Sequence, residues 1–149
     1  VSFYAKHQQH VFSVDNLEYL RRGGRVSNVA AFFGGMLNIK PVLDVEEGKL
    51  IPVYKCRGHK KAMQKLVDMV KERSVHSDIQ NQIIGITHSD CMDTVEEVKA
   101  MMEEQLGVTR FEVGEIGSVI SCHTGPGTIA IFFLDEWPQD PAYHVVKKG

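Results

Sequence analysis

Residues 83–116, IIGITHSDCMDTVEEVKAMMEEQLGVTRFEVGEI, run through a strand pattern, a helix pattern and a second strand pattern. Residues 83–87 are a short apolar run, which is typical of a buried strand. Apolar side chains then recur at helical spacing, at Val95, Val98, Met102 and Leu106. Gly107 is a helix-ending residue, and residues 110–116 alternate as in a strand. This order of strand, helix and strand predicts an α/β layered domain.

The chain after residue 116 continues the pattern and then changes in composition. Residues 117–127 read as a loop or a short helix, and residues 128–134 are an apolar run of strand length. The polar sequence DEWPQDPAYHVVKKG follows. We therefore expect a core domain over residues 1–134 and a polar extension over residues 135–149.

The first half of the sequence predicts a hairpin. Residues 39–45 and 50–56 flank the turn sequence EEGK, which is typical of two paired strands. Pro41 and Pro52 favour edge or irregular positions for both strands, because proline donates no ladder hydrogen bond. Residues 10–14 predict one more short strand. The hairpin makes the predicted sheet mixed.

Helix starts are indicated by capping patterns. Asp15 with Glu18, and Asp93 with Glu96, have the spacing of a capping box. Ser27 is placed to cap a helix over residues 28–37, which is apolar and small nearly all round and so predicted to be buried. Residues 60–73 predict an amphipathic helix.

Composition narrows the class of protein. The 149 residues suit one domain, 43% of them are hydrophobic, and the net charge of -2 argues against a nucleic-acid binder. No apolar run is long enough to span a membrane. The three cysteines are far apart and odd in number, which favours reduced thiols in the cytoplasm. The chain begins at Val1 instead of Met, which suggests a fragment or a processed chain.

Two basic segments are candidate anion sites. Residues 21–25, RRGGR, lie between two predicted helices, and arginine suits carboxylate or phosphate. Residues 55–61, KCRGHKK, lie where a predicted strand passes into a helix, a common place for ligand contacts. For both, a solvated basic helix end is the alternative interpretation. It suits the second segment less, because positive charge opposes the dipole at a helix start.

Residues 121–128, SCHTGPGT, form the third candidate site. The sequence predicts a backbone-rich loop that presents His123 and hydroxyl groups before a buried strand. It is neither a phosphate-binding loop of the GKS/T type nor a dinucleotide fingerprint. Cys122 beside His123 could suggest a thiol nucleophile, but adjacent side chains usually point apart. His7 and His10 have no further ligands at metal spacing, so no metal site is expected.

The segments LEYLRRGGRVS, LNIKPVL, EEGKLIPVYKCRGHKKAM and GEIGSVISCHTGPGTIAIFFL together resemble the DegV family. They have the order and spacing of that family's second domain. The resemblance implies a mixed sheet of about six strands with helices packed on it, a fold shared with dihydroxyacetone kinases. It implies a bacterial, cytoplasmic protein with a separate N-terminal DegV domain, which this chain lacks.

The same resemblance implies a lipid-binding role. DegV proteins hold a long-chain fatty acid between two domains and present its carboxylate to a separate ATP-dependent fatty acid kinase, which forms an acyl-phosphate. By that resemblance, His123 binds the carboxylate with Thr124 and Gly125 as supports, and Arg25 and Arg57 handle phosphate or dock the kinase. The wall of the acyl tunnel falls on one predicted helix, at Ala30, Phe33, Gly34 and Leu37.

Neither a catalytic residue in this chain nor a cofactor is expected on this reading. One alternative is an enzyme that uses the same histidine and arginines on a small phosphorylated compound. The absence of an obvious nucleophile or metal cluster in the sequence argues against it. A regulatory domain is a third possibility, although the sequence has neither a helix-turn-helix pattern nor a basic stripe.

Overall fold

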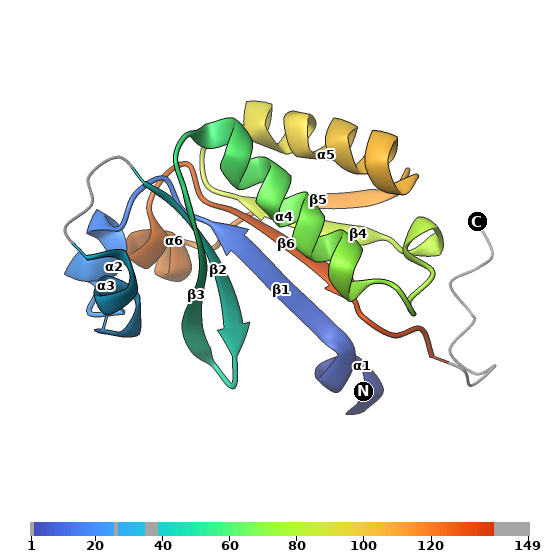
Figure 1. Ribbon diagram of the computed structural model, residues 1–149, viewed down its shortest axis with the longest axis horizontal. Helices are drawn as coiled ribbons and strands as arrows, with labels where there is room; N and C mark the ends of the chain where they lie inside the picture. The colour runs from blue at the N-terminus through green and yellow to red at the C-terminus, as the bar shows by residue number, and fades with distance from the viewer. Residues whose placement is uncertain (1, 26, 35–38, 139–149) are drawn as a thin grey trace.

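The computed structural model describes residues 2–25, 27–34 and 39–138, and its centre is a single six-stranded sheet (Figure 1). The strand order is β3-β2-β1-β6-β4-β5. The strands are β1 (Gln8–Ser13), β2 (Lys40–Glu46), β3 (Lys49–Cys56), β4 (Ile84–His88), β5 (Phe111–Glu115) and β6 (Ile129–Leu134). β4 and β5 are parallel, whereas the other neighbouring pairs are antiparallel. The predicted mixed α/β sheet is confirmed.

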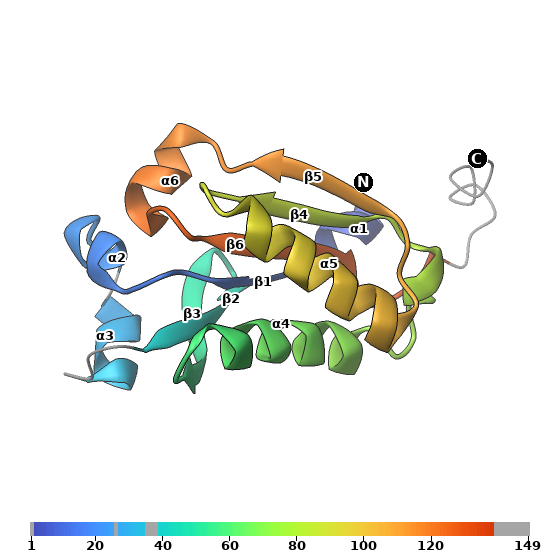
Figure 2. The same ribbon diagram turned by 90° about the horizontal axis from the view of Figure 1, so that it is seen from above.

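Two long helices cover one face of this sheet. α4 (His59–Arg73) and α5 (Met92–Leu106) lie side by side above the strands (Figures 1 and 2). Alternate residues of the central strands point toward them and are buried, among them Val11, Ile84, Ile86, Ile129 and Ile131. The helices contribute the apolar faces that the sequence periodicity predicts, so the main core lies in this layer.

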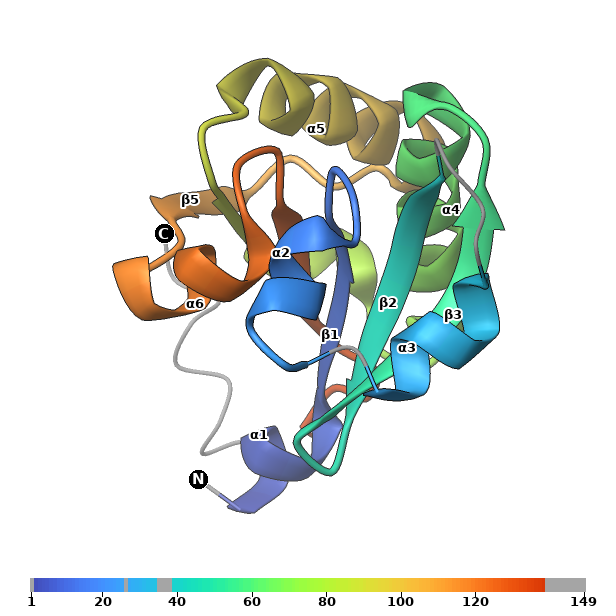
Figure 3. The same ribbon diagram turned by 90° about the vertical axis from the view of Figure 1, so that its left-hand side faces the viewer.

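Three short helices gather at one end of the opposite face. They are α2 (Glu18–Arg22), α3 (Ser27–Phe33) and α6 (Ser118–Thr124), which Figure 3 shows toward the viewer. Leu20 and Phe33 pack here against Phe12 and Leu43 in a second apolar core. Two smaller elements complete the description, α1 (Ser2–His7) and the 3-10 helix η1 (Ile79–Asn81). None of the described helices is long and apolar enough to cross a bilayer.

The hairpin prediction is confirmed, but only one of its two strands, β3, lies at the edge of the sheet. β2 and β3 are joined by a turn in which Glu47 has φ 49° and Gly48 has φ 75°, the left-handed pair that suits a two-residue hairpin turn. β3 is an edge strand, as Pro52 predicts. β2 lies inside the sheet despite Pro41, which is only its second residue. Pro41 instead contributes its carbonyl oxygen, which accepts a 2.9 Å hydrogen bond from the hydroxyl of Ser13.

The predicted capping boxes are wrong. α2 begins later than expected, and Asp15 does not cap it but pairs with Lys40 at 2.9 Å. The oxygen of Asn16 accepts the hydrogen bond from the amide of Glu18 instead. In α5 the capping residue is Cys91, without a side-chain hydrogen bond, and Asp93 lies inside the first turn. An oppositely charged side chain from a distant segment therefore competes successfully for a carboxylate that local spacing assigns to a cap.

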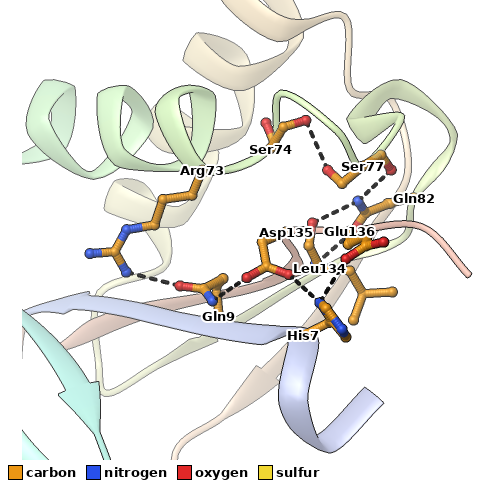
Figure 4. Close-up of polar contacts among 9 residues, drawn as sticks. All are labelled: His7, Gln9, Arg73, Ser74, Ser77, Gln82, Leu134, Asp135 and Glu136. Atoms are coloured by element: carbon orange, nitrogen blue, oxygen red, sulfur yellow. Dashed lines mark hydrogen bonds and ion pairs between the residues drawn. The ribbon is translucent and has the colours of Figure 1, made fainter. Parts of the chain in front are cut away.

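A chain of polar contacts ties the two ends of the described fold to α4 (Figure 4). Arg73 Nη2 lies 2.7 Å from Oδ2 of the buried Asp44, and its Nη1 donates to Gln9 Oε1 at 3.0 Å. Gln9 Nε2 donates to Asp135 Oδ2 at 2.7 Å, and Asp135 Oδ1 lies 2.9 Å from His7 Nδ1. The residues just after β6 thus pack against the start of β1. Local sequence patterns, which predict a separate polar extension from residue 135, do not anticipate this contact.

Candidate functional site

A groove of about 530 Å³ lies on the sheet face that α4 and α5 leave free. It is bounded at one end by α2 and α6 and along one side by the β2–β3 hairpin. Its lining residues come from seven elements and their connections: His10, Phe12, Leu20, Arg25, Val45, Leu50, Thr87, Ile116, Val119, Ile120, His123, Thr124, Thr128, Ala130 and Phe132. The lining is mostly apolar, with a few polar groups near the end where α6 lies.

The floor of the groove follows from strand alternation. In β6, Ile129 and Ile131 point into the main core, so Ala130 and Phe132 point to the other face. In β4 the same alternation brings Thr87 to the groove. Phe132 also lines a second hollow of about 440 Å³, so its side chain borders both hollows.

α6 forms one rim of the groove with unusually exposed apolar side chains. Val119 is 77% exposed and Ile120 is 60% exposed, although both line the groove. Isolated apolar residues are common on protein surfaces, whereas exposed apolar neighbours beside an apolar groove are typical of interaction surfaces.

His123 lies in the last turn of α6, so of the two predicted alternatives for this segment, a loop or a short helix, the structure has the short helix. Its Nδ1 is buried and has no hydrogen-bond partner among the described residues. The imidazole lines the groove, and Nε2 is the ring nitrogen that is not buried in this way. A histidine nitrogen at the end of an apolar groove can donate a hydrogen bond to a carboxylate.

Thr124 and Gly125 follow His123 and shape its setting. The hydroxyl of Thr124 donates to the carbonyl oxygen of Ile120 at 3.2 Å, inside the helix. Gly125 ends α6 with φ 81°. The buried hydroxyl of Thr128 donates to the carbonyl oxygens of Thr124 and Gly125, at 3.1 and 2.7 Å. These contacts hold the turn between α6 and β6.

Arg25 lines the same groove as His123, so the structure brings these two predicted site residues together. Its Nη1 donates a 2.7 Å hydrogen bond to the carbonyl oxygen of Gly23. The neighbouring arginines are different, because Arg21 and Arg22 both bind the carboxylate of Glu18 at 2.8–2.9 Å. Hydrogen bonds from Arg21 and then Arg22 lower the pKa of Glu18 to about 2. In the part of the chain that the structure describes, Arg25 has no acidic partner.

Arg57 lies outside this groove. It lines a separate hollow of about 510 Å³ at the start of α4, with Gly58, His59, Lys60, Lys61 and Gln64. The first turn of α4 has no acidic residue, and Gly58 offers no side-chain cap. Of the basic groups, His59 is partnered, with Nε2 lying 2.7 Å from Glu97 Oε2. A basic helix start without acidic residues in its first turn favours an anionic partner.

The helix predicted to form the tunnel wall is α3, and none of its described side chains lines the groove. Phe33 is fully buried in the second core, under the hairpin, and Gly34 follows the helix with φ 59°. The side chain of Ala30, and Leu37 as a whole, lie outside the described residues. The groove lining instead includes Val45, Leu50 and the α6 pair, which the sequence patterns did not single out.

Three further histidines make contacts of their own. His7 binds Asp135, and His88 Nδ1 accepts a 3.4 Å hydrogen bond from the amide of Cys91. His10 lies in the groove with its ring edge-on to Phe132, 5.2 Å between centroids. Within residues 2–25, 27–34 and 39–138, no group of three or more metal-ligating side chains converges.

Comparison with known proteins gives consistent matches. The family described as "Uncharacterised protein, DegV family COG1307" matches residues 1–136. A DegV domain-containing protein of Clostridium perfringens is 41% identical over 128 residues, which cover 85% of this chain and 43% of the relative. This chain therefore spans less than half the length of that relative.

Two solved structures give the same result in three dimensions. A fatty acid binding DegV family protein from Streptococcus agalactiae has a TM-score of 0.77 and 32% identity, covering 93% of this chain and 47% of that one. A DegV family protein from Thermus thermophilus, described by its fatty acid binding, has a TM-score of 0.74 and 33% identity, covering 85% and 45%.

Proposed function

This chain belongs to the DegV family, and from that premise we propose that it supplies one half of a binding site for a long-chain fatty acid. The acyl chain lies along the open sheet face, and its carboxylate lies at the α6 end. The N-terminal DegV domain of the intact protein covers the groove from the other side. This placement gives the exposed Val119 and Ile120 an apolar neighbour.

The observation that carries the proposal is the groove itself. Its volume of about 530 Å³ lies in the range of ligand pockets, and several of its polar groups, among them His123, Thr124 and Thr128, lie at the α6 end. A fatty acid has the same division into a long apolar chain and one charged end. At about 0.8 kcal/mol per buried methylene, enclosing a chain of ~16 carbons is worth on the order of 10 kcal/mol.

The polar end of the groove suits a carboxylate. Nε2 of His123 can donate one hydrogen bond, and the guanidinium of Arg25, which lacks an acidic partner among the described residues, supplies positive charge nearby. Hydrogen bonds to charged groups are stronger than those between neutral groups. The backbone around Thr124 and Gly125 supports this arrangement and leaves the carboxylate contact to His123.

We also propose that the bound carboxylate is presented to a separate ATP-dependent kinase. That enzyme would transfer the γ-phosphoryl group of ATP to a carboxylate oxygen, giving acyl-phosphate and ADP. Arg57 and its basic hollow then serve as the docking surface, because they lie outside the groove and lack acidic residues in the first helix turn. No acid–base or nucleophilic step is assigned to this chain, and the three free cysteines suit the cytoplasm.

The alternative of a phosphate-handling enzyme is less well supported by the same site. Such an enzyme would use His123 and Arg25, but it would leave the long apolar part of the groove without a purpose. The described residues also offer no converging metal ligands for a phosphorylated substrate.

Lipid content and a blocked groove test the proposal. Mass spectrometry of organic extracts of the purified intact protein is expected to recover long-chain fatty acid. Ala130→Trp fills the floor of the groove and should abolish saturable oleate binding, whereas Ala100→Trp, an exposed site on α5, should leave it unchanged. An intact protein that carries no lipid and does not bind oleate would refute the proposal.

Docking is tested separately from lipid binding. Arg57→Glu should retain oleate affinity, because the residue lies outside the groove, yet lose acyl-phosphate formation with purified kinase and ATP. Lys71→Glu, at the other end of α4, is the matched control with the same charge change. Equal acyl-phosphate yields from both variants would remove the docking role.

A further inference from the structure

The unpartnered nitrogen of His123 lies directly against a glycine. A Cβ built on Gly23 would overlap Nδ1 of His123 and lie 3.1 Å from its Cε1 and Cγ. The buried side of the imidazole therefore rests on the backbone at the end of α2. Because Nδ1 has no hydrogen-bond partner among the described residues, this close contact is what limits rotation of the ring.

The absence of a side chain at Gly23 makes room for His123 and is not required by the backbone conformation of Gly23 itself. Gly23 has φ -77° and ψ -1°, which any residue can adopt. Gly24 beside it has φ 70°, and a Cβ there would meet nothing within 4 Å, so that glycine serves the left-handed turn. Glycine is therefore required at position 23 to leave room for His123, and at position 24 to allow the left-handed backbone conformation.

A second contact in the opposite direction joins the same two helices. The ring of Tyr19, one helical turn before Gly23, lies against Gly125, two residues after His123. The imidazole of His123 in α6 thus packs on Gly23 at the end of α2, and the ring of Tyr19 in α2 packs on Gly125 at the end of α6. This reciprocal packing fixes the angle between the two helices and with it the approach of His123 to the groove.

Gly23 also contacts the second polar residue of the groove. Its carbonyl oxygen accepts the 2.7 Å hydrogen bond from Nη1 of Arg25, while its Cα faces Nδ1 of His123. We propose that Gly23 is a positioning residue that holds His123 with Nε2 toward the groove and anchors Arg25 beside it. This inference rests on the carboxylate-binding role proposed for His123.

The test is a double-mutant cycle in the intact protein, with oleate as the probe. Gly23→Ala adds one methyl group without backbone strain and should weaken oleate binding about tenfold, the loss expected for one charge-assisted hydrogen bond. In a His123→Ala background the same methyl finds free space and should change the affinity less than twofold. Gly114→Ala is the matched control, because a Cβ there meets nothing within 4 Å.

A second readout reports the imidazole directly. Nuclear magnetic resonance of the histidine rings in lipid-free protein should show displaced His123 signals in Gly23→Ala and unchanged ones in Gly114→Ala. Unmoved ring signals together with wild-type oleate affinity in Gly23→Ala would overturn the inference. Equal weakening by Gly23→Ala with and without His123 would also overturn it, since the glycine would then act by another route.

Two further outcomes separate this inference from the proposed function. If His123→Ala binds oleate as tightly as the wild type, the carboxylate role fails, and the ring signals alone decide whether Gly23 positions the histidine. If Gly23→Ala does not fold but Gly23→Ala/His123→Ala does, the result supports the steric overlap between a Cβ at position 23 and the imidazole of His123. A double variant that also fails to fold would assign Gly23 to folding and overturn the inference.

Discussion

The ring of Tyr19 lies against Gly125 so closely that a Cβ on this glycine would overlap Cδ2 and Cγ of the ring. Gly125 is also the C-cap residue of α6. It has φ 81° and ψ 174°, a backbone region that residues other than glycine avoid. Conformation and packing therefore both require glycine here. The turn that carries His123 into β6 depends on this one position.

Gly125→Ala is expected to lower the free energy of unfolding by about 3 kcal/mol, from backbone strain and from displacement of the Tyr19 ring. Urea unfolding followed by circular dichroism measures the change. Gly24→Ala is the control, because it also has positive φ but open space, and it should cost only about 1 kcal/mol. Equal losses for the two variants would show that the ring contact contributes nothing.

The pair of arginines on α2 should keep Glu18 ionised to low pH. Hydrogen bonds from Arg21 and Arg22 lower its pKa from 4.5 to about 2, so this contribution to stability is present above pH 4.5 and is lost as the pH falls toward 2. Carbon-13 detection of the side-chain carboxyl should give a midpoint near 2. The midpoint should rise toward 4.5 in Arg21→Gln/Arg22→Gln, and an unchanged midpoint there would contradict the assignment.

Arg73 is expected to be important for stability because it pairs with a carboxylate that is only 4% exposed. Arg73→Met leaves Asp44 buried without its partner and should cost about 3 kcal/mol, measured by urea unfolding near neutral pH. Lys71→Met, at an exposed position of the same helix, should change stability by less than about 0.5 kcal/mol. Indistinguishable stabilities would mean that Asp44 is adequately held by its neighbours.

The three thiols should react at different rates. Cys122 is exposed, whereas burial raises the pKa of Cys56 and of Cys91 above the ordinary thiol value. Since the thiolate is the reactive form, we expect iodoacetamide at pH 8 to label Cys122 first, with peptide mass spectrometry as the readout. Cys122→Ser should remove the fast phase. A fast phase that persists in this variant would contradict the predicted order.

The regular elements could be predicted because their signals are local. The periodicity of Val95, Val98, Met102 and Leu106 and the left-handed Gly107 describe α5 almost as the structure has it. The caps could not be predicted in the same way, because Asp15 pairs with Lys40, and the sequence between them does not reveal that they meet.

The site was predictable in part. His123 and Arg25 line one groove, whereas Arg57, which the family resemblance groups with Arg25, lines a separate hollow. The sequence pattern left a loop and a short helix open for the segment of His123, and the structure has the helix α6. The apolar lining depends on which strands become neighbours. Val45 of β2 and Ala130 of β6 line the same groove because a single strand, β1, lies between β2 and β6 in the sheet. No local sequence pattern encodes that strand order.

The position of β1 also determines how this domain can fold. Gln8 pairs with Leu134 and Ser13 pairs with Ile129, so the centre of the sheet joins the beginning of the described fold to its end. Such long-range pairing slows folding, because a large loop must close before the contact can form. A nascent chain that has not yet released β6 holds two separate strand groups, β3-β2-β1 and β4-β5. Premature termination before residue 129 would therefore remove the strand that joins the two halves of the sheet.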